Sequence, residues 1–287
     1  MFFKYRKLKN YLFLASLVIA SILVITPLIL VVSHVFKMGI GSINLDFFTK
    51  LPKPVGEVGG GMVHAILGTL YLVSIGAVIA IPIGLICGIY LSEYGKGILP
   101  ATLRYTIDLL TGVPSIVIGI FAYLLVVVPF KGFSALAGGF ALSIIILPIV
   151  VRSTEEILKL VPNHIREAGL ALGLPKWKVI YFIIVKGSLS GIFTGIILAI
   201  SRAAGETAPL LFTAFGHMYL SFNPTSPMAS LPVQIYNYAI SPFEDWQRQA
   251  WAGSFVLIAI VLGLNLTART LINRDKVKTF YRKVISR

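Results

Sequence analysis

Six long apolar stretches, separated by polar segments, limit what this chain can fold into. Each is long enough for a helix, rising ~1.5 Å per residue, to cross the ~30 Å hydrocarbon core of a bilayer. Hydrophobic residues make up 57% of the chain and charged residues 13%, which excludes an ordinary water-soluble domain. We therefore predict an all-α integral membrane protein. Its six transmembrane helices are expected at residues 11–36, 63–91, 105–130, 133–151, 188–215 and 251–272.

The lysines and arginines are distributed unevenly between the two sides that these spans define. If both termini lie in the cytoplasm, the inside segments hold 19 of the 25 basic residues and the outside segments hold five, with Arg202 inside a span. This asymmetry predicts cytoplasmic termini, and it explains the net charge of +14 without nucleic-acid binding. The apolar part of residues 1–36 is about twice as long as that of a signal peptide, so we expect a retained first span.

The chain is expected to form one membrane domain. Residues 1–62 hold a basic segment, the first span and an outer loop, residues 63–272 hold the other five spans, and residues 273–287 form a basic tail. Most spans contain a proline, which indicates either a protein-lined interior or ordinary kinking. The single cysteine, Cys87, and four scattered histidines show no metal-ligand spacing, and we expect no cofactor.

Two charges stand inside the fifth predicted span, in the stretch SRAAGETAPLL. An arginine or glutamate at the centre of a bilayer costs about 2.5 to 3.5 kcal/mol, so such residues are functional or paired. Arg202 and Glu206 are four residues apart and can pair on one face of a helix, which Pro209 is expected to loosen at Gly205. The planar guanidinium of Arg202 matches two phosphate oxygens; a self-neutralising ion pair is the alternative.

Two further charged residues and one outer segment are candidates with open roles. Arg152 ends the fourth predicted span, where it either anchors the helix or contributes to an anion path. Asp108, near the start of the third predicted span, is expected to be an interfacial acid rather than a ligand. The aromatic residues of the outer segment 216–250 form either a membrane-interface belt or a docking surface.

Residues 152–187, between the fourth and fifth predicted spans, are too long and too patterned for a simple turn. Apolar and small residues recur at helical spacing until Gly173 and Pro175 stop the helix, and a second helix follows. Small residues at 168, 169 and 173 leave room to enter a groove on another protein, and a helix lying on the membrane is the alternative. The sequence has no phosphate-binding loop of the type GxxxxGK[ST], so any ATP is bound by another chain.

This segment resembles the coupling loop of the permease subunits of bacterial ABC importers, which carries Glu-Ala-Ala, three residues and then Gly. Glu167, Ala168, Gly169 and Gly173 occupy these positions, with glycine in place of the second alanine. Three stretches are similar, more narrowly, to the phosphate-specific permeases of this family. They are TGVPSIVIGIF, LPIVVRSTEEILKLVP and RAAGETAPLLFTA.

The resemblance implies a type I, MetI-like permease fold in a bacterial cytoplasmic membrane. Together with the buried charges, it predicts a path for inorganic phosphate at Arg202, Glu206 and Arg152, and ATPase docking at the Glu167 to Gly173 helix. It implies as partners a homologous sister permease, two ATPase subunits and an extracytoplasmic phosphate-binding protein, while this chain is not itself an enzyme. The alternatives are a permease for another oxyanion such as sulfate or molybdate, an ion-driven carrier or channel, and a membrane sensor.

Overall fold

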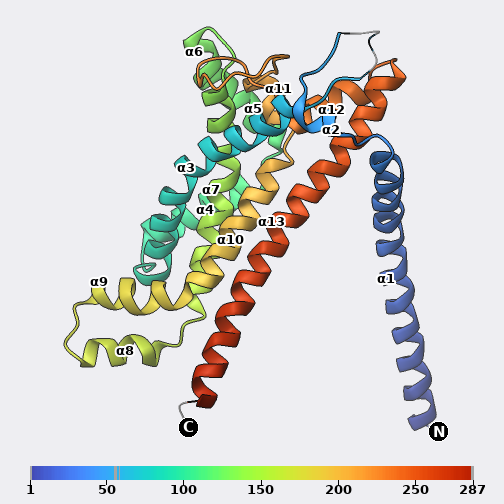
Figure 1. The fold of residues 1–287 in the computed structure, drawn as a ribbon. Helices are drawn as coiled ribbons and strands as arrows, with labels where there is room; N and C mark the ends of the chain where they lie inside the picture. The colour runs from blue at the N-terminus through green and yellow to red at the C-terminus, as the bar shows by residue number, and fades with distance from the viewer. Residues whose placement is uncertain (1, 55–56, 58, 286–287) are drawn as a thin grey trace.

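The computed structural model describes residues 2–54, 57 and 59–285, and every regular element in that part of the chain is helical. Figure 1 shows a bundle of long helices, with α8 and α9 projecting at one end and α1 standing apart. The α-helices are α1 (Phe2–Ile40), α2 (Leu45–Thr49), α3 (Val63–Glu93), α4 (Ile98–Gly112), α5 (Ser115–Ala122), α6 (Val128–Phe130), α7 (Ala135–Lys159), α8 (Asn163–Ala171), α9 (Lys176–Lys178), α10 (Lys186–Ala204), α11 (Ala208–Thr213), α12 (Leu231–Ala239) and α13 (Glu244–Ile285). The π-helical turns η1 (Tyr123–Val127) and η2 (Val179–Val185) interrupt them.

The predicted all-α membrane fold is confirmed. In the described part of the chain, five helices are long and apolar enough to cross a membrane, and the bent pair of α4 with α5–α6 makes a sixth if it is one span. The five are Tyr5–Ile40, Val63–Glu93, Ala135–Lys159, Lys176–Ala204 and Glu244–Thr267. Each of the six predicted stretches overlaps one of these spans, although two of the predictions need correction.

The third predicted span, 105–130, is not one continuous helix. The segments Ile98–Gly112 and Ser115–Phe130 differ in direction by 104°. Pro114 explains this break, because proline disfavours the helical conformation in the residue before it, and Val113 is extended with ψ of 129°. The chain therefore turns sharply inside the membrane region.

The fifth predicted span, 188–215, is displaced along the chain. The spanning helix is Lys176–Ala204, made of α9, η2 and α10, and it ends at Gly205. Glu206 lies outside any helix, and Pro209 stands in the first turn of α11, where its missing N–H removes no helical bond. The predicted loosening at Gly205 is thus a complete end of the helix.

Helices α3 and α7 form the most extensive contact of the bundle. At intervals of four residues, α3 carries small residues on one face, namely Gly76, Ala80, Gly84 and Gly88. A Cβ atom at Gly88 would lie 2.7 Å from the Cβ of Thr154 and 2.8 Å from the carbonyl oxygen of Val151. Lipid tails are as apolar as side chains, so close backbone packing of this kind holds membrane helices together.

Helix α1 stands apart from this bundle (Figure 1) and its apolar stretch is unburied. It touches α13 near one end, where the ring centroids of His34 and Trp251 are 5.0 Å apart. The start of α1 and the end of α13 lie at the same end of the molecule as α8 (Figure 1). The side chains of the predicted basic tail, residues 273–287, are not among those that the structure describes.

Candidate functional site

Two helix breaks meet at a small cavity in the middle of the bundle. The cavity measures about 20 Å³, which is room for roughly one water-sized sphere. Its lining comes from the α4–α5 break, the middle of α7 and the α10–α11 break, and includes Leu110, Thr111, Val113, Ser115, Ile118, Ile145, Pro148, Ile149, Arg202 and Glu206. Pro148 lies near the midpoint of the 25-residue helix α7, which places the cavity near mid-membrane.

Helices α5 and α11 hold the two breaks against each other. A Cβ atom at Gly119 of α5 would stand 2.7 Å from the Cα of Pro209 on α11. Any larger residue at position 119 would therefore push α11 away from α5. This close packing fixes the position of the chain just after Glu206, so the acid is held by backbone packing as well as by its charge.

Arg202 and Glu206 form the predicted pair, and their contact is loose. Nε of Arg202 lies 3.7 Å from Oε1 of Glu206, beyond hydrogen-bond distance. The arginine side chain is 53% exposed and the glutamate 15%. Because Glu206 lies past the end of α10, the pair crosses a helix end rather than lying on one helical face. Most donors of the guanidinium remain open.

Arg152 lies about one helical turn from Pro148, toward the end of α7 that leads into α8. It is paired with an acid there. Its Nε donates to Oδ1 of Asp108 on α4 at 2.8 Å, and its Nη2 contacts the same oxygen. Arg152 is absent from the lining of the cavity, so the structure does not bring it together with Arg202 there. Asp108, expected to be an interfacial acid, is 55% exposed and is the partner of a predicted site residue.

A second charged group follows on the same two helices. Glu155 of α7 has a fully buried side chain, and its Oε1 accepts hydrogen bonds at 2.6 Å from Nε of Arg104 and from Nζ of Lys159. Nη1 of Arg152 lies 3.5 Å from the other carboxylate oxygen. Arg104 also donates to two carbonyls at the end of α3. Charged groups thus run from the mid-membrane cavity to the end of the bundle that carries α8.

The helix predicted at the cytoplasmic loop is present as α8, and its predicted stop at Gly173 is confirmed. Gly173 has a φ of +78°, a backbone conformation that glycine adopts without strain. Glu167 and Ala168 are exposed, whereas Gly169 is buried against η2, where a Cβ would lie 3.0 Å from Val179. Three of the four motif residues are therefore available to a partner, and Gly169 packs within the chain.

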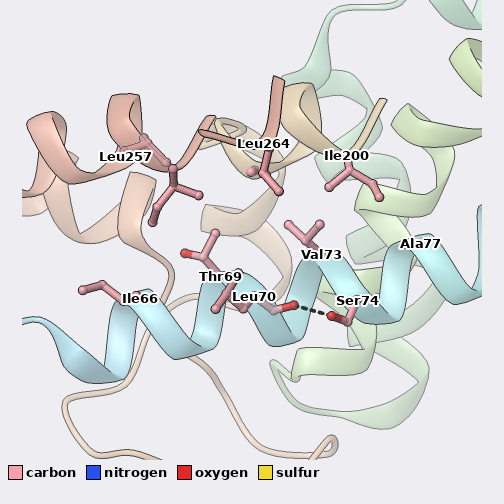
Figure 2. Close-up of a pocket in the computed structure, with 11 residues that line it drawn as sticks. Ile66, Thr69, Leu70, Val73, Ser74, Ala77, Ile200, Leu257 and Leu264 are labelled. Carbon is pink, nitrogen blue, oxygen red and sulfur yellow. Dashed lines mark hydrogen bonds between the residues drawn. The ribbon is translucent and has the colours of Figure 1, made fainter. Parts of the chain in front are cut away.

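Figure 2 shows a different cavity, of about 140 Å³, between α3, α10 and α13. Its walls are almost entirely apolar, and its two hydroxyl groups are already bonded. Thr69 accepts from the backbone N–H of Leu231 at 2.7 Å, and Ser74 donates to the carbonyl of Leu70 at 2.6 Å. This cavity offers no polar site for an anion. Among the described residues, no three His, Cys, Asp or Glu side chains gather as metal ligands would.

A bundle of broken membrane helices around a charged mid-membrane cavity, with an exposed helix at one end, defines a transport permease. The chain belongs to the family described as binding-protein-dependent transport system inner membrane component, whose model matches residues 80–274. It is therefore a multi-pass protein of a bacterial inner membrane and not itself an enzyme.

Known proteins are similar along almost the whole chain. The phosphate transport system permease protein PstA of Yersinia pestis is 44% identical, covering 95% of this chain and 92% of its own. Its counterpart of the same name in Haemophilus influenzae is 42% identical, covering 96% and 97%. Among solved structures, a chain of the MetNI methionine ABC transporter has a TM-score of 0.61 at 17% identity, covering 74% of this chain and 95% of that one. This likeness shows the predicted type I, MetI-like permease fold.

Proposed function

We propose that this chain is the transmembrane permease subunit of an ATP-driven importer of inorganic phosphate. The observation that carries the proposal is the match to phosphate transport permeases along nearly their whole length. The charged mid-membrane cavity supports it, because a charge at that depth indicates a substrate path. Both termini are proposed to lie in the cytoplasm, in agreement with the distribution of basic residues.

Arg202 is the residue that we assign to the anion. Its guanidinium is half exposed at a helix end and has one loose contact, so its planar fork is open to two phosphate oxygens. The cavity within this chain is too small for the ion, and a homologous sister permease is proposed to complete the path. Glu206 neutralises or orients Arg202, and Arg152 contributes further along, where phosphate competes with Asp108.

The remaining partners follow from the two ends of the molecule. Helix α8 is proposed to dock an ATPase subunit through Glu167, Ala168 and Gly173, with two such subunits serving the two permeases. An extracytoplasmic phosphate-binding protein is proposed to dock on the outer segment 216–250 and deliver the ion. Closure of the ATPases then moves α8, and the path changes the side to which it opens.

The test is purification of the chain with its native companions, followed by reconstitution in lipid vesicles. The proposal expects an ATPase to be purified with this chain, and ATP-dependent uptake of radiolabelled phosphate when the binding protein is added. Uptake of sulfate or molybdate in place of phosphate would identify another oxyanion importer. Transport without ATP or without an ATPase subunit would identify an ion-driven carrier and reject the proposal.

A further inference from the structure

One ion pair joins the projecting helix α8 to the end of α3. The carboxylate of Glu93 accepts from Arg166 three times, from Nε at 3.2 Å and 3.1 Å and from Nη2 at 2.7 Å. The glutamate side chain is 4% exposed and the arginine 19%. Arg166 also donates to the carbonyls of Leu158, at 2.9 Å, and of Val161. Each of its three nitrogen atoms therefore donates, and the guanidinium brings the end of α3, the end of α7 and α8 to one point.

The second arm of the same loop holds the same end of α3. Nζ of Lys176, at the start of α9, donates to the backbone carbonyl of Glu93 at 3.1 Å. The same ammonium group lies 3.9 Å from the ring centroid of Tyr94, a cation–π distance. These contacts are exposed and single, so the multiple bonds of Arg166 are the stronger attachment of the loop to α3.

The long helices of the bundle pack in a row. Helix α3 packs along α7 through its small residues, α7 packs on α10, and α10 packs on α13. Between α3 and α13 lies the apolar cavity of Figure 2, with Val73 on one side and Leu257 and Leu264 on another. A cavity leaves its walls without contact partners, so α3 and α13 are free to change their separation there at little energetic cost.

We propose that the Arg166–Glu93 pair is the connector that passes the movement of α8 to α3. This inference rests on the proposed function, in which an ATPase moves α8. Without the pair, α8 still packs on η2 through Gly169 and therefore still moves with α10. What is lost is the side-chain attachment of α8 to α3, so ATP-driven movement of α8 no longer changes the separation of α3 and α13. Arg166 and Glu93 are positioning residues, because neither touches the proposed anion site.

The first test measures phosphate taken up per ATP hydrolysed in the reconstituted complex. Glu93→Gln and Arg166→Gln are each expected to keep ATP hydrolysis while lowering uptake per ATP roughly tenfold, in line with losing hydrogen bonds between charged groups. The double variant is expected to be no worse than either single variant, because both remove one link. Glu156→Gln is the matched control, since this carboxylate is exposed and forms no ion pair in the described part of the chain. Uptake and hydrolysis falling in equal proportion would reject the connector.

The second test needs no phosphate, so it separates failure of the connector from failure of the proposed function. Cys87→Ala removes the only cysteine, and Ile86→Cys with Leu266→Cys places spin labels on exposed sites of α3 and α13. Adding ATP to the complex is expected to change the distance between the labels, and Glu93→Gln is expected to abolish the change. A change that persists in Glu93→Gln, or no change in its parent, overturns the connector. If the labels behave as expected but phosphate is not transported, only the proposed function fails.

Discussion

Arg202 and Arg166 are each paired with a glutamate, but the two pairs are built in opposite ways. Arg202 makes one contact of 3.7 Å, and its side chain is 53% exposed. Arg166 makes three hydrogen bonds to its glutamate and two to backbone carbonyls, and its side chain is 19% exposed. The guanidinium of Arg202 keeps most of its donors open, whereas every nitrogen atom of the Arg166 guanidinium donates a hydrogen bond. The same residue type therefore suits a ligand site in the first case and a mechanical link in the second.

The difference arises from where each pair sits in the fold. Arg202 and its acid flank the end of α10, where the chain leaves the helix and a cavity opens. Arg166 lies in the interior of α8, between the carboxylate at the end of α3 and the last carbonyls of α7, which need donors. An arginine surrounded by such acceptors donates from all three nitrogen atoms, and one at a helix break with a single acid nearby does not.

The largest effect is expected from changing the open arginine. Arg202→Lys keeps the charge but loses the planar fork, so phosphate uptake is expected to fall about ten- to hundredfold, the value of charge-assisted hydrogen bonds of ~1.5–3 kcal/mol. The amount of protein in the membrane is expected to stay unchanged. Arg6→Lys, at an exposed residue of the N-terminal basic segment, is the matched control. Equal uptake by Arg202→Lys and wild type would mean that Arg202 is only an ion-pair partner.

The role of the acid beside Arg202 is tested by comparing two anions. Glu206→Gln keeps the size of the side chain and removes its charge. We expect phosphate-stimulated ATP hydrolysis to fall roughly tenfold with no gain for sulfate, because the contact of 3.7 Å makes Glu206 the partner of Arg202. A gain for sulfate would instead mean that Glu206 accepts the P–OH hydrogen of phosphate and rejects the anion that lacks it. Unchanged rates with both anions would remove Glu206 from the mechanism.

A smaller effect is expected at the end of α8. Gly173→Trp fills the space beside the proposed docking surface and also strains a backbone with φ of +78°, so ATPase binding is expected to weaken several-fold. Gly173→Asn separates the two causes, because asparagine tolerates this conformation and is small. Pull-down of the ATPase by each variant measures the effect. Full binding and normal transport by the tryptophan variant would show that position 173 does not face the ATPase.

These comparisons also show what the sequence could and could not predict. The apolar stretches, the helix before Gly173 and the Arg202–Glu206 pair depend on residues close together in the chain, so local patterns predict them. The Arg166–Glu93 bonds join residues 73 positions apart, and the Arg104–Glu155 bond joins residues 51 positions apart. No local pattern contains such pairs. They follow only from the packing of α3, α4 and α7, which brings their ends together.

The two helix breaks were only partly predictable from the local sequence. Pro114 and Pro209 were both visible as prolines within apolar stretches, and either kinking or a break was consistent with them. The structure shows that the chain turns by 104° near the first, and that the helix ends five residues before the second. The close approach of Gly119 to Pro209 packs the segments after the two breaks against each other, and this contact depends on tertiary packing.

The smallest effect is expected in thermal stability. It reports directly how firmly each of the two arginines is held by its glutamate. In Glu93→Gln a partly buried arginine loses its charged partner. Loss of a partner in a buried pair destabilises proteins by about 3–5 kcal/mol, and the lower value is expected because glutamine still accepts a hydrogen bond. In Glu206→Gln the partner is a half-exposed arginine, and a loss of ~0–1 kcal/mol is expected. At one heating rate in one detergent, the apparent Tm is therefore expected to fall by several degrees in the first variant and by roughly 0–3 °C in the second.

Glu244→Gln, at the exposed pair with Arg248, gives the reference for a surface contact. Equal shifts in Glu93→Gln and Glu206→Gln would mean that Arg202 is held as firmly as Arg166, and the assignment of Arg202 to an incoming anion would lose its physical basis.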